Sequence, residues 1–229
     1  MNTLQEAIAI PASTGLLTGE LSVPENAGGL VIFAHGTGSS HLSPRNQFVA
    51  QKLNSDGFAT FLFDLLTEDE EIEDLSTGDL RFDIAFLADR LTFATSWLRA
   101  NKNVAEFPYG FFGASTGAAA ALRSAAGSEV RAIVSRGGRP DMAGDALTKT
   151  EAATLLIVGG EDKLVLELNR QAYDKIRAAK RLAIIPGATH LFEEPGTLEH
   201  AAQLAGEWFL KYLRGPGKGD PAAWKDENK

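Results

Sequence analysis

The chain has 229 residues, a formal net charge of −8 and no cysteine. This length can bury a substantial single core, and the acidic balance argues against nucleic acid and anionic membranes as partners. The lack of cysteine excludes disulfides, a thiolate nucleophile and a zinc–thiolate site. No apolar run approaches the roughly 18 residues of a membrane span, and residues 1–10 lack the features of a secretory signal. We therefore expect a cytoplasmic protein.

Apolar runs and longer amphipathic stretches alternate along most of the chain. Partial alternation predicts strands at 4–10 and 15–23, and continuous apolar runs predict strands at 28–34, 58–66, 109–114, 130–135, 153–158 and 181–185. Continuous hydrophobicity is typical of strands that are buried on both faces, as in a parallel sheet covered by helices. Helical patterns occupy 45–55, 82–101, the segment from 116, 164–178 and 198–213.

This order of elements predicts an α/β fold with an open, mostly parallel sheet and helices on both faces. Residues 1–214 are expected to form a single domain, without a large cap domain because every segment between strands is short. Residues 215–229 are expected to be a loose polar tail. The acidic segment 67–79 is interpreted as a solvated loop, with a flap over the site as the alternative.

The sequence Gly-Ala-Ser-Thr-Gly at 113–117 lies between a predicted buried strand and an alanine-rich helix. In this context a G-x-S-x-G motif predicts a sharp turn that exposes the hydroxyl of Ser115 above the sheet. The flanking glycines remove side chains that would clash where strand meets helix. Ser115 is therefore the candidate nucleophile, with an ordinary serine in a tight turn as the alternative.

A serine nucleophile needs a base, and the base needs an acid that holds its tautomer. Of the four histidines, His190 follows a late strand at the edge where such sheets bind ligands, so it is the candidate base. Asp162 ends the preceding strand and is the candidate acid, with a helix N-cap as its alternative role. The neighbouring Glu161 is expected to point the other way.

Acyl transfer also needs donors for the oxyanion, and backbone N–H groups can serve. One donor is expected from Thr116, the residue after the nucleophile. The second is expected from the His-Gly-Thr-Gly turn at 35–38, with Thr37 as first choice and Gly38 as second.

Arg136 and Arg139 follow a strand at the same edge of the sheet. They are either surface charges, which could pair with the acidic segment, or ligands for a substrate carboxylate. The sequence contains no phosphate-binding or dinucleotide-binding fingerprint.

The sequence resembles α/β-hydrolases and is similar to the dienelactone hydrolase-like group of small serine hydrolases. The resemblance covers roughly residues 16–214 and rests on four motifs: His-Gly-Thr-Gly at 35–38, Gly-Ala-Ser-Thr-Gly at 113–117, Gly-Gly-Glu-Asp at 159–162 and Thr-His-Leu-Phe at 189–192. It implies an eight-stranded sheet with one antiparallel strand and a triad of Ser115, Asp162 and His190. Dienelactone hydrolases proper usually carry a cysteine nucleophile, whereas this chain has serine. Segments 63–66 and 135–140 also look like hydrolase domains found beside phosphoribosyltransferase domains, although this sequence shows no such second domain.

The resemblance and the motifs together predict a short-chain carboxylesterase that works through an acyl-enzyme and needs no metal or organic cofactor. Its partner is a small-molecule ester, and a homodimer is left open. Two alternatives remain at this stage: an acyltransferase with the same triad, and a non-catalytic binding protein that retains the fold.

Overall fold

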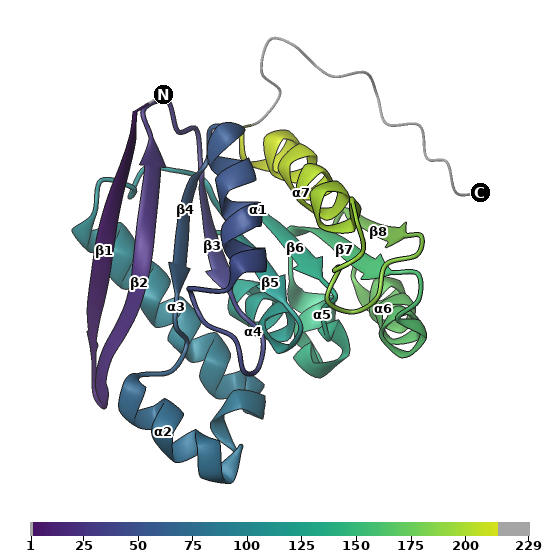
Figure 1. Cartoon of the computed structure of the whole chain (residues 1–229), viewed down its shortest axis with the longest axis horizontal. Coiled ribbons are helices and arrows are strands. Elements are labelled where there is room, and N and C mark those ends of the chain that lie inside the picture. Colours follow the sequence, from purple (N-terminus) through teal and green to yellow (C-terminus); the bar gives the residue numbers. More distant parts are fainter. Residues whose placement is uncertain (1, 215–229) are drawn as a thin grey trace.

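The computed structural model describes residues 2–214, so the tail expected at 215–229 lies outside the described residues. The described part is built on one eight-stranded sheet in the order β1-β2-β4-β3-β5-β6-β7-β8 (Figure 1). The strands are β1 (Thr3–Ala12), β2 (Gly15–Pro24), β3 (Leu30–Ala34), β4 (Ala59–Phe63), β5 (Tyr109–Ala114), β6 (Ala132–Arg136), β7 (Ala153–Gly159) and β8 (Lys180–Ile185).

Strand β2 pairs antiparallel with both β1 and β4, and the remaining pairs of neighbours are parallel. The expected α/β class, the mostly parallel sheet and the one antiparallel strand are therefore confirmed. All residues of β3 to β7 are buried, which explains their continuous rather than alternating hydrophobicity.

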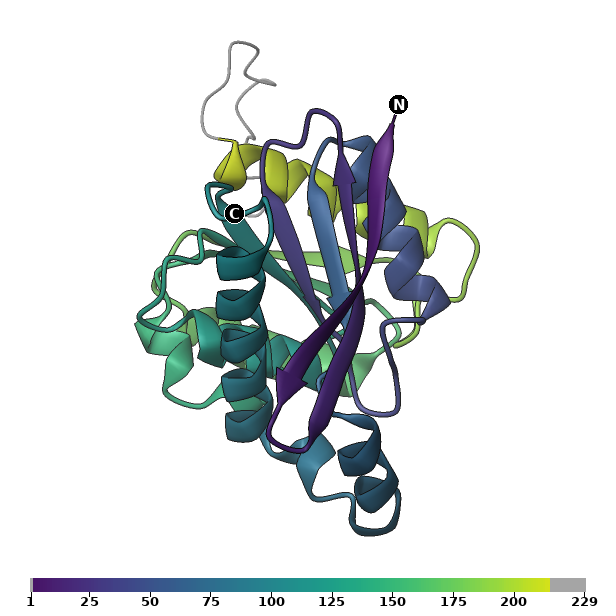
Figure 2. The same cartoon turned by 90° about the vertical axis from the view of Figure 1, so that its left-hand side faces the viewer.

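Helices cover both faces of the sheet. They are α1 (Pro44–Ser55), α2 (Glu68–Thr77), α3 (Ile84–Asn101), α4 (Thr116–Ala125), α5 (Ala146–Lys149), α6 (Lys163–Lys175) and α7 (Thr197–Leu213), with short 3₁₀ turns η1 (Leu80–Phe82) and η2 (Pro140–Ala143). The core on one face includes buried residues of α1 and α7, and the core on the other includes residues of α3 and α4. Figure 2 shows α1 and α3 on opposite sides of the sheet. Neighbouring strand residues divide between the two cores, as Phe111 and Phe112 do.

The interpretation of residues 67–79 as a solvated loop is wrong, because most of the segment is helix α2. Thr67 and Glu70 form a reciprocal capping box at its start, and Gly78 ends it in the left-handed conformation with φ 70°. The four acidic residues of its first turn suit the positive end of the helix dipole. Two of its carboxylates, Glu70 and Asp74, are buried against arginines from later elements.

Several predicted boundaries move by a few residues. The helix expected at 82–101 begins at Ile84, because the Asp83 side chain accepts a hydrogen bond from the Phe86 N–H and caps it. The strand expected to reach residue 66 ends at Phe63, the last residue that pairs with β2, and its pairing with β3 ends one residue earlier. Within residues 2–214, no helix combines the length and the apolar character that crossing a bilayer requires.

Candidate active site

Ser115 occupies a sharp turn between β5 and α4. Its backbone has φ 50° and ψ −124°, and Phe192 is the other non-glycine residue with positive φ among residues 2–214. This conformation is unfavourable for a residue with a Cβ atom and persists only where its surroundings fix it. The Ser115 N–H donates to the Arg136 carbonyl at 3.4 Å, and the Ser115 carbonyl accepts from the N–H groups of Ala118 at 3.1 Å and Arg139 at 3.0 Å.

Three glycines make this turn sterically feasible. A Cβ atom on Gly113 would lie 2.4 Å from Ala118 Cα, and one on Gly117 would lie 2.1 Å from the Ala34 carbonyl oxygen. A Cβ atom on Gly36, in the loop after β3, would lie 2.8 Å from Ser115 Cβ. Side chains at these positions would push apart β3, β5 and α4, so the packing of these elements requires glycine at all three.

Asp162 and His190 come together at the same edge of the sheet. Asp162 follows β7 and His190 follows β8, and Asp162 Oδ2 lies 2.6 Å from His190 Nδ1. Asp162 stands at the N-cap position of α6, yet its side chain makes no capping bond there. The Asp162 side chain is 14% exposed and the imidazole 40% exposed. Nδ1–H donates to the carboxylate in this arrangement, which leaves Nε2 as an acceptor.

The loop that carries His190 is held at its start by Glu194. This carboxylate accepts from the Thr189 N–H at 3.0 Å and from the Thr189 hydroxyl at 2.7 Å. These hydrogen bonds lower the pKa of Glu194 below its ordinary value. Within residues 2–214, Ser115 Oγ and His190 share no hydrogen bond. The structure therefore joins the candidate acid to the candidate base and leaves the serine hydroxyl separate.

The expected oxyanion donors lie on two neighbouring segments. Thr116 is the first residue of α4, where the first N–H groups of a helix have no partner inside it. The Thr37 N–H donates to Thr116 Oγ1 at 3.1 Å, so this amide already has an acceptor. The two threonine hydroxyl oxygens lie 3.0 Å apart, and the Thr37 hydroxyl donates to the Arg81 carbonyl at 3.3 Å. Gly38 has φ 69° and open space around its α-carbon.

Two histidines hold the loop between β3 and α1 against the end of β4. His35 Nε2 accepts from the Leu65 N–H at 3.0 Å, and its Nδ1 lies 2.9 Å from the Gly36 carbonyl oxygen. Burial lowers the pKa of His35, so the ring is neutral with its proton on Nδ1. At the other end of the loop, the N–H and Nδ1 of His41 both lie 2.7 Å from oxygens of Asp64. Neither histidine has a predicted role from the sequence.

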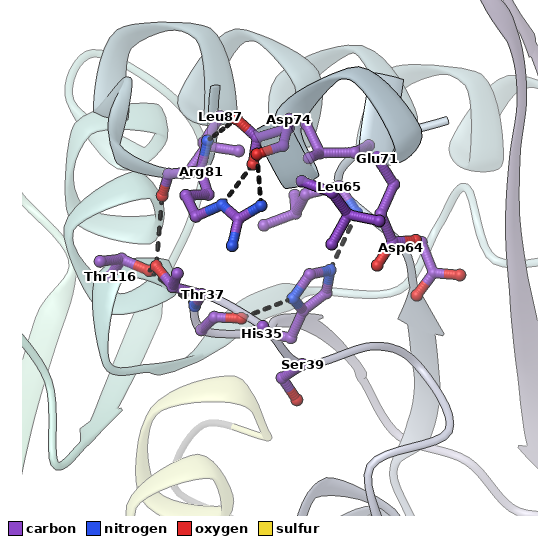
Figure 3. A pocket seen from close by; sticks show the side chains of 14 residues that line it. His35, Thr37, Ser39, Asp64, Leu65, Glu71, Asp74, Arg81, Leu87 and Thr116 are labelled. Carbon is purple, nitrogen blue, oxygen red and sulfur yellow. Dashed lines mark hydrogen bonds and ion pairs between the residues drawn. The ribbon is translucent and has the colours of Figure 1, made fainter. Parts of the chain in front are cut away.

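A pocket of about 70 Å³ opens beside the loop between β3 and α1 (Figure 3). Ser115 is not among its lining residues, but Gly36, Thr37 and Thr116 are, so the pocket adjoins the turn that carries Ser115. Its far wall comes from α2, η1 and α3. The other lining residues are His35, Gly38, Ser39, Asp64, Leu65, Leu66, Glu71, Asp74, Leu75, Arg81 and Leu87.

Arg81 is a candidate functional residue that was not predicted from the sequence. Its Nε lies 2.5 Å from Asp74 Oδ2 and its Nη2 lies 2.5 Å from the Asp74 carbonyl oxygen, and the third guanidinium nitrogen points into the pocket (Figure 3). Burial opposes ionisation of Asp74, but hydrogen bonds from Arg81 and from the Leu80 N–H outweigh it and lower the pKa. Arg81 is the lone basic residue between Lys52 and Arg90, which was the available signal for an ion pair with the acidic segment.

The two arginines considered as carboxylate ligands lie elsewhere. Arg139 pairs with Asp141 through Nε at 2.9 Å and Nη2 at 2.8 Å, which raises its pKa. Arg136 is buried on the α1 and α7 face of the sheet, where it contacts Asn46, Phe112 and Phe192. Neither lines the pocket, but neither do Ser115 and His190, so the role of the two arginines as carboxylate ligands stays a prediction.

Comparison with known proteins decides the family. The model of the dienelactone hydrolase family matches residues 17–214. The chain belongs to the dienelactone hydrolase family. The dienelactone hydrolase of Anabaena variabilis is 52% identical, with a TM-score of 0.90 over 93% of this chain and 99% of that chain. The α/β serine hydrolase without a lid from Xanthomonas campestris is 18% identical, with a TM-score of 0.74 over 93% and 97%, a likeness that shows the fold alone.

Two curated relatives of this dienelactone hydrolase family member come from two strains of Mycobacterium tuberculosis. Each is 53% identical over 214 residues and is named "Putative phosphoribosyl transferase". The match covers 93% of this chain but 47% of each relative. The chain therefore spans about half the length of the curated relatives that it matches.

Proposed function

We propose that this chain is a serine hydrolase that cleaves carboxylic esters of short acids or alcohols. The observation that carries the proposal is the 2.6 Å contact between Asp162 and His190 at the sheet edge where Ser115 occupies a strained turn. An acid, a base and a hydroxyl from three different strand ends meet the chemical requirements of nucleophilic acyl transfer. Membership of the dienelactone hydrolase family supports the same reaction class.

In the proposed first step, His190 Nε2 takes the proton of Ser115 as the serine oxygen attacks the ester carbonyl. Asp162 holds the imidazole by its Nδ1–H and stabilises the imidazolium that forms. The tetrahedral intermediate collapses, the carbon–oxygen bond to the alcohol breaks, and His190 returns its proton to the leaving alcohol. Water then enters, loses a proton to His190 and attacks the acyl-enzyme, which releases the acid and restores the serine hydroxyl.

The mechanism requires a hydrogen bond between Ser115 and His190 that the free protein lacks. Catalytic hydrogen bonds are often long or poorly aligned before substrate binds, so we propose that this bond forms in the complex with substrate. The strained backbone, in contrast, is already in place and requires no change during the reaction.

For the oxyanion we propose the N–H groups of Thr116 and Thr37. The Thr37 amide currently donates to Thr116 Oγ1, so it must exchange that neutral acceptor for the charged oxyanion. In the free protein, the Thr116 hydroxyl would hold the loop between β3 and α1 in place before substrate binds. The Gly38 amide remains the second choice.

The pocket size indicates the kind of ester. A cavity of about 70 Å³ holds a group of a few heavy atoms, well below the several hundred Å³ of pockets for drug-sized ligands. Leucines at positions 65, 66, 75 and 87 suit an apolar stem, and the Arg81 guanidinium supplies a donor for a polar atom. We therefore expect short acyl or alcohol groups with a polar end.

An acyltransferase would use the same three residues but would have to exclude water. The His190 imidazole is 40% exposed, which favours hydrolysis because water can reach the acyl-enzyme. Product analysis with and without an added alcohol separates the two reactions. A new ester as the main product, with little free acid, would identify a transferase.

The test is the turnover of p-nitrophenyl acetate by the wild type, Ser115→Ala and Ser124→Ala. Ser124 is a matched control because it lies on the same helix and its hydroxyl bonds to Thr92, away from the site. We expect kcat/KM to fall by about 10³-fold or more in Ser115→Ala and to stay at the wild-type value in Ser124→Ala. Equal turnover by all three proteins would refute Ser115 as nucleophile. A folded wild type without turnover would favour a binding protein.

A further inference from the structure

The two strained non-glycine residues of the described chain both contact Arg136. Ser115 donates its N–H to the Arg136 carbonyl, and Phe192, with φ 56°, lies two residues after His190. The Arg136 guanidinium carbon lies 5.9 Å from the ring centroid of Phe192 and 5.9 Å from that of Phe112, within the range of a cation–π contact. Phe112 belongs to β5, the strand that leads to the nucleophile.

Arg136 is buried without a negative partner. The residue is 8% exposed and forms no ion pair within residues 2–214. Its Nη2 donates to Asn46 Oδ1 at 3.2 Å, whereas Nε and Nη1 are buried with no hydrogen-bond partner. Burial, with a smaller effect from Arg45, lowers its pKa to about 10, so the guanidinium remains charged at neutral pH.

Stability does not account for such a residue. Apolar side chains of similar volume often replace buried charges with no loss of stability, or with a gain. An unpaired cation that is kept among aromatic rings therefore needs another explanation.

The loop that carries His190 packs directly on Gly137, the residue after Arg136. A Cβ atom on Gly137 would lie 3.1 Å from the His190 carbonyl oxygen and 3.4 Å from Phe192 Cε2. The turn that carries Ser115 and the loop that carries His190 therefore meet at the end of β6. A shift of the Phe192 ring would move the backbone that carries the imidazole.

We propose that Arg136 is a positioning residue whose guanidinium, held between Phe112 and Phe192, sets the position of His190 relative to Ser115. This inference rests on the proposed function. Arg136 acts through Phe192 and does not touch substrate, because its unbonded nitrogens are shielded from solvent. Misplacement of a catalytic group by about 1 Å can lower a rate by about 100-fold, so a modest shift of the loop is sufficient to be measured.

The test compares Arg136→Met, Arg136→Lys and the control Arg131→Met. Methionine retains much of the volume and removes the charge, lysine keeps a cation, and Arg131 is an exposed arginine just before the start of β6. In Arg136→Met we expect an unchanged melting temperature, a kcat lowered about tenfold or more, and a KM within about twofold of the wild type. Labelling of Ser115 by a fluorophosphonate should slow in parallel. Arg136→Lys should recover part of kcat, and Arg131→Met should match the wild type.

A second variant covers failure of Arg136→Met to fold. Phe192→Leu removes the ring and keeps the arginine, so it should give the same loss of kcat. If both variants fold, the fold-loss of kcat in the double variant Arg136→Met/Phe192→Leu should be smaller than the product of the two single fold-losses, because both substitutions break the same contact. Losses that multiply fully would contradict the proposed contact.

Three results would overturn the inference. One is a wild-type kcat in the Arg136→Met or Phe192→Leu variant. Another is a rise in KM confined to esters that bear a carboxylate, which would make Arg136 a substrate ligand. An inactive, unlabelled wild type would refute the proposed function itself and the inference with it. Active wild type with unaffected variants would refute the inference alone.

Discussion

At the scale of single residues, the proposed chemistry depends on which carboxylate reaches His190. Asp162 makes this contact, whereas the adjacent Glu161 is 56% exposed and pairs with Lys163 at 3.4 Å. Neighbouring residues after a strand end point in different directions, so one of two adjacent acids can face the base while the other faces solvent. The two residues therefore form a matched pair for mutation.

We expect Asp162→Asn to lower kcat of ester hydrolysis by about 10³ to 10⁴-fold, because an amide does not hold the imidazole in the tautomer that accepts the serine proton. Glu161→Gln should leave kcat unchanged. Steady-state kinetics with p-nitrophenyl acetate measures both. An equal effect of the two substitutions would remove Asp162 from the triad.

His35 gives a pH dependence at the same scale. Burial lowers its pKa below the ordinary value of 6.5, so the unfolded chain binds a proton more readily than the folded one. The stability from neutral His35 is therefore fully present above pH 6.5 and is lost as pH falls through the folded-state pKa. We expect the free energy of unfolding in urea to fall less steeply with acidification in His35→Asn than in the wild type. A control at the exposed His200 should keep the wild-type slope. Identical slopes for wild type and His35→Asn would contradict the neutral, buried state.

At the scale of elements, the acidic segment 67–79 folds as helix α2 and forms one wall of the pocket. Glu70 accepts from Arg90 at 2.5 Å, from the Thr14 hydroxyl at 2.5 Å and from the Thr67 N–H at 2.9 Å. One carboxylate thus joins α2 to α3 and to the turn between β1 and β2. Arg81 and Asp74 make a second link between α2 and η1.

Glu70→Gln should therefore destabilise the protein by about 2–4 kcal/mol, because it leaves the Arg90 charge buried and unpaired. The exposed Glu73→Gln on the same helix should change stability by less than about 0.5 kcal/mol. Urea unfolding followed by circular dichroism measures both values. A loss below about 1 kcal/mol in Glu70→Gln would show that the ion pair contributes little.

Helix α2 also shows why some elements could be predicted from the sequence and others could not. The Thr-x-x-Glu pattern at 67–70 is a local signal for a helix start, but six acidic residues between 68 and 74 favour a solvated segment. What buries two of them is pairing with Arg81 and Arg90, which come from later elements. Such pairing depends on tertiary contacts that periodicity does not contain. The buried strands, whose signal is local hydrophobicity, were located to within a few residues.

At the scale of the whole molecule, the sheet order explains how the candidate site is assembled. Strands β5, β6, β7 and β8 are consecutive neighbours and parallel, so Ser115, Asp162 and His190 leave the sheet at one edge. The alternation of elements predicted a mostly parallel sheet whose strands end at one ligand-binding edge, and this made the three residues predictable candidates. The order of the strands was not predicted and comes from the structure. The Thr37 bond to Thr116 and the inward side chain of Arg136 depend on three-dimensional packing and were not predictable.

The size of the pocket leads to a prediction for the whole active site. We expect kcat/KM for p-nitrophenyl acetate or propionate to exceed that for the octanoate ester by about tenfold or more, because a cavity of about 70 Å³ does not accept a long chain. Initial rates across the acyl series measure this preference. A kcat/KM that rises with chain length would show that the acyl chain binds along the open surface instead.

The central claim is that Ser115 is an activated nucleophile, and labelling with a fluorophosphonate followed by mass spectrometry tests it most directly. The reagent forms a stable bond to a serine that a nearby base has activated, whether or not the natural ester is known. We predict one adduct on the wild type, located to the peptide that contains Ser115, and none on Ser115→Ala. A folded wild type without an adduct, or an adduct that persists in Ser115→Ala, would contradict the account.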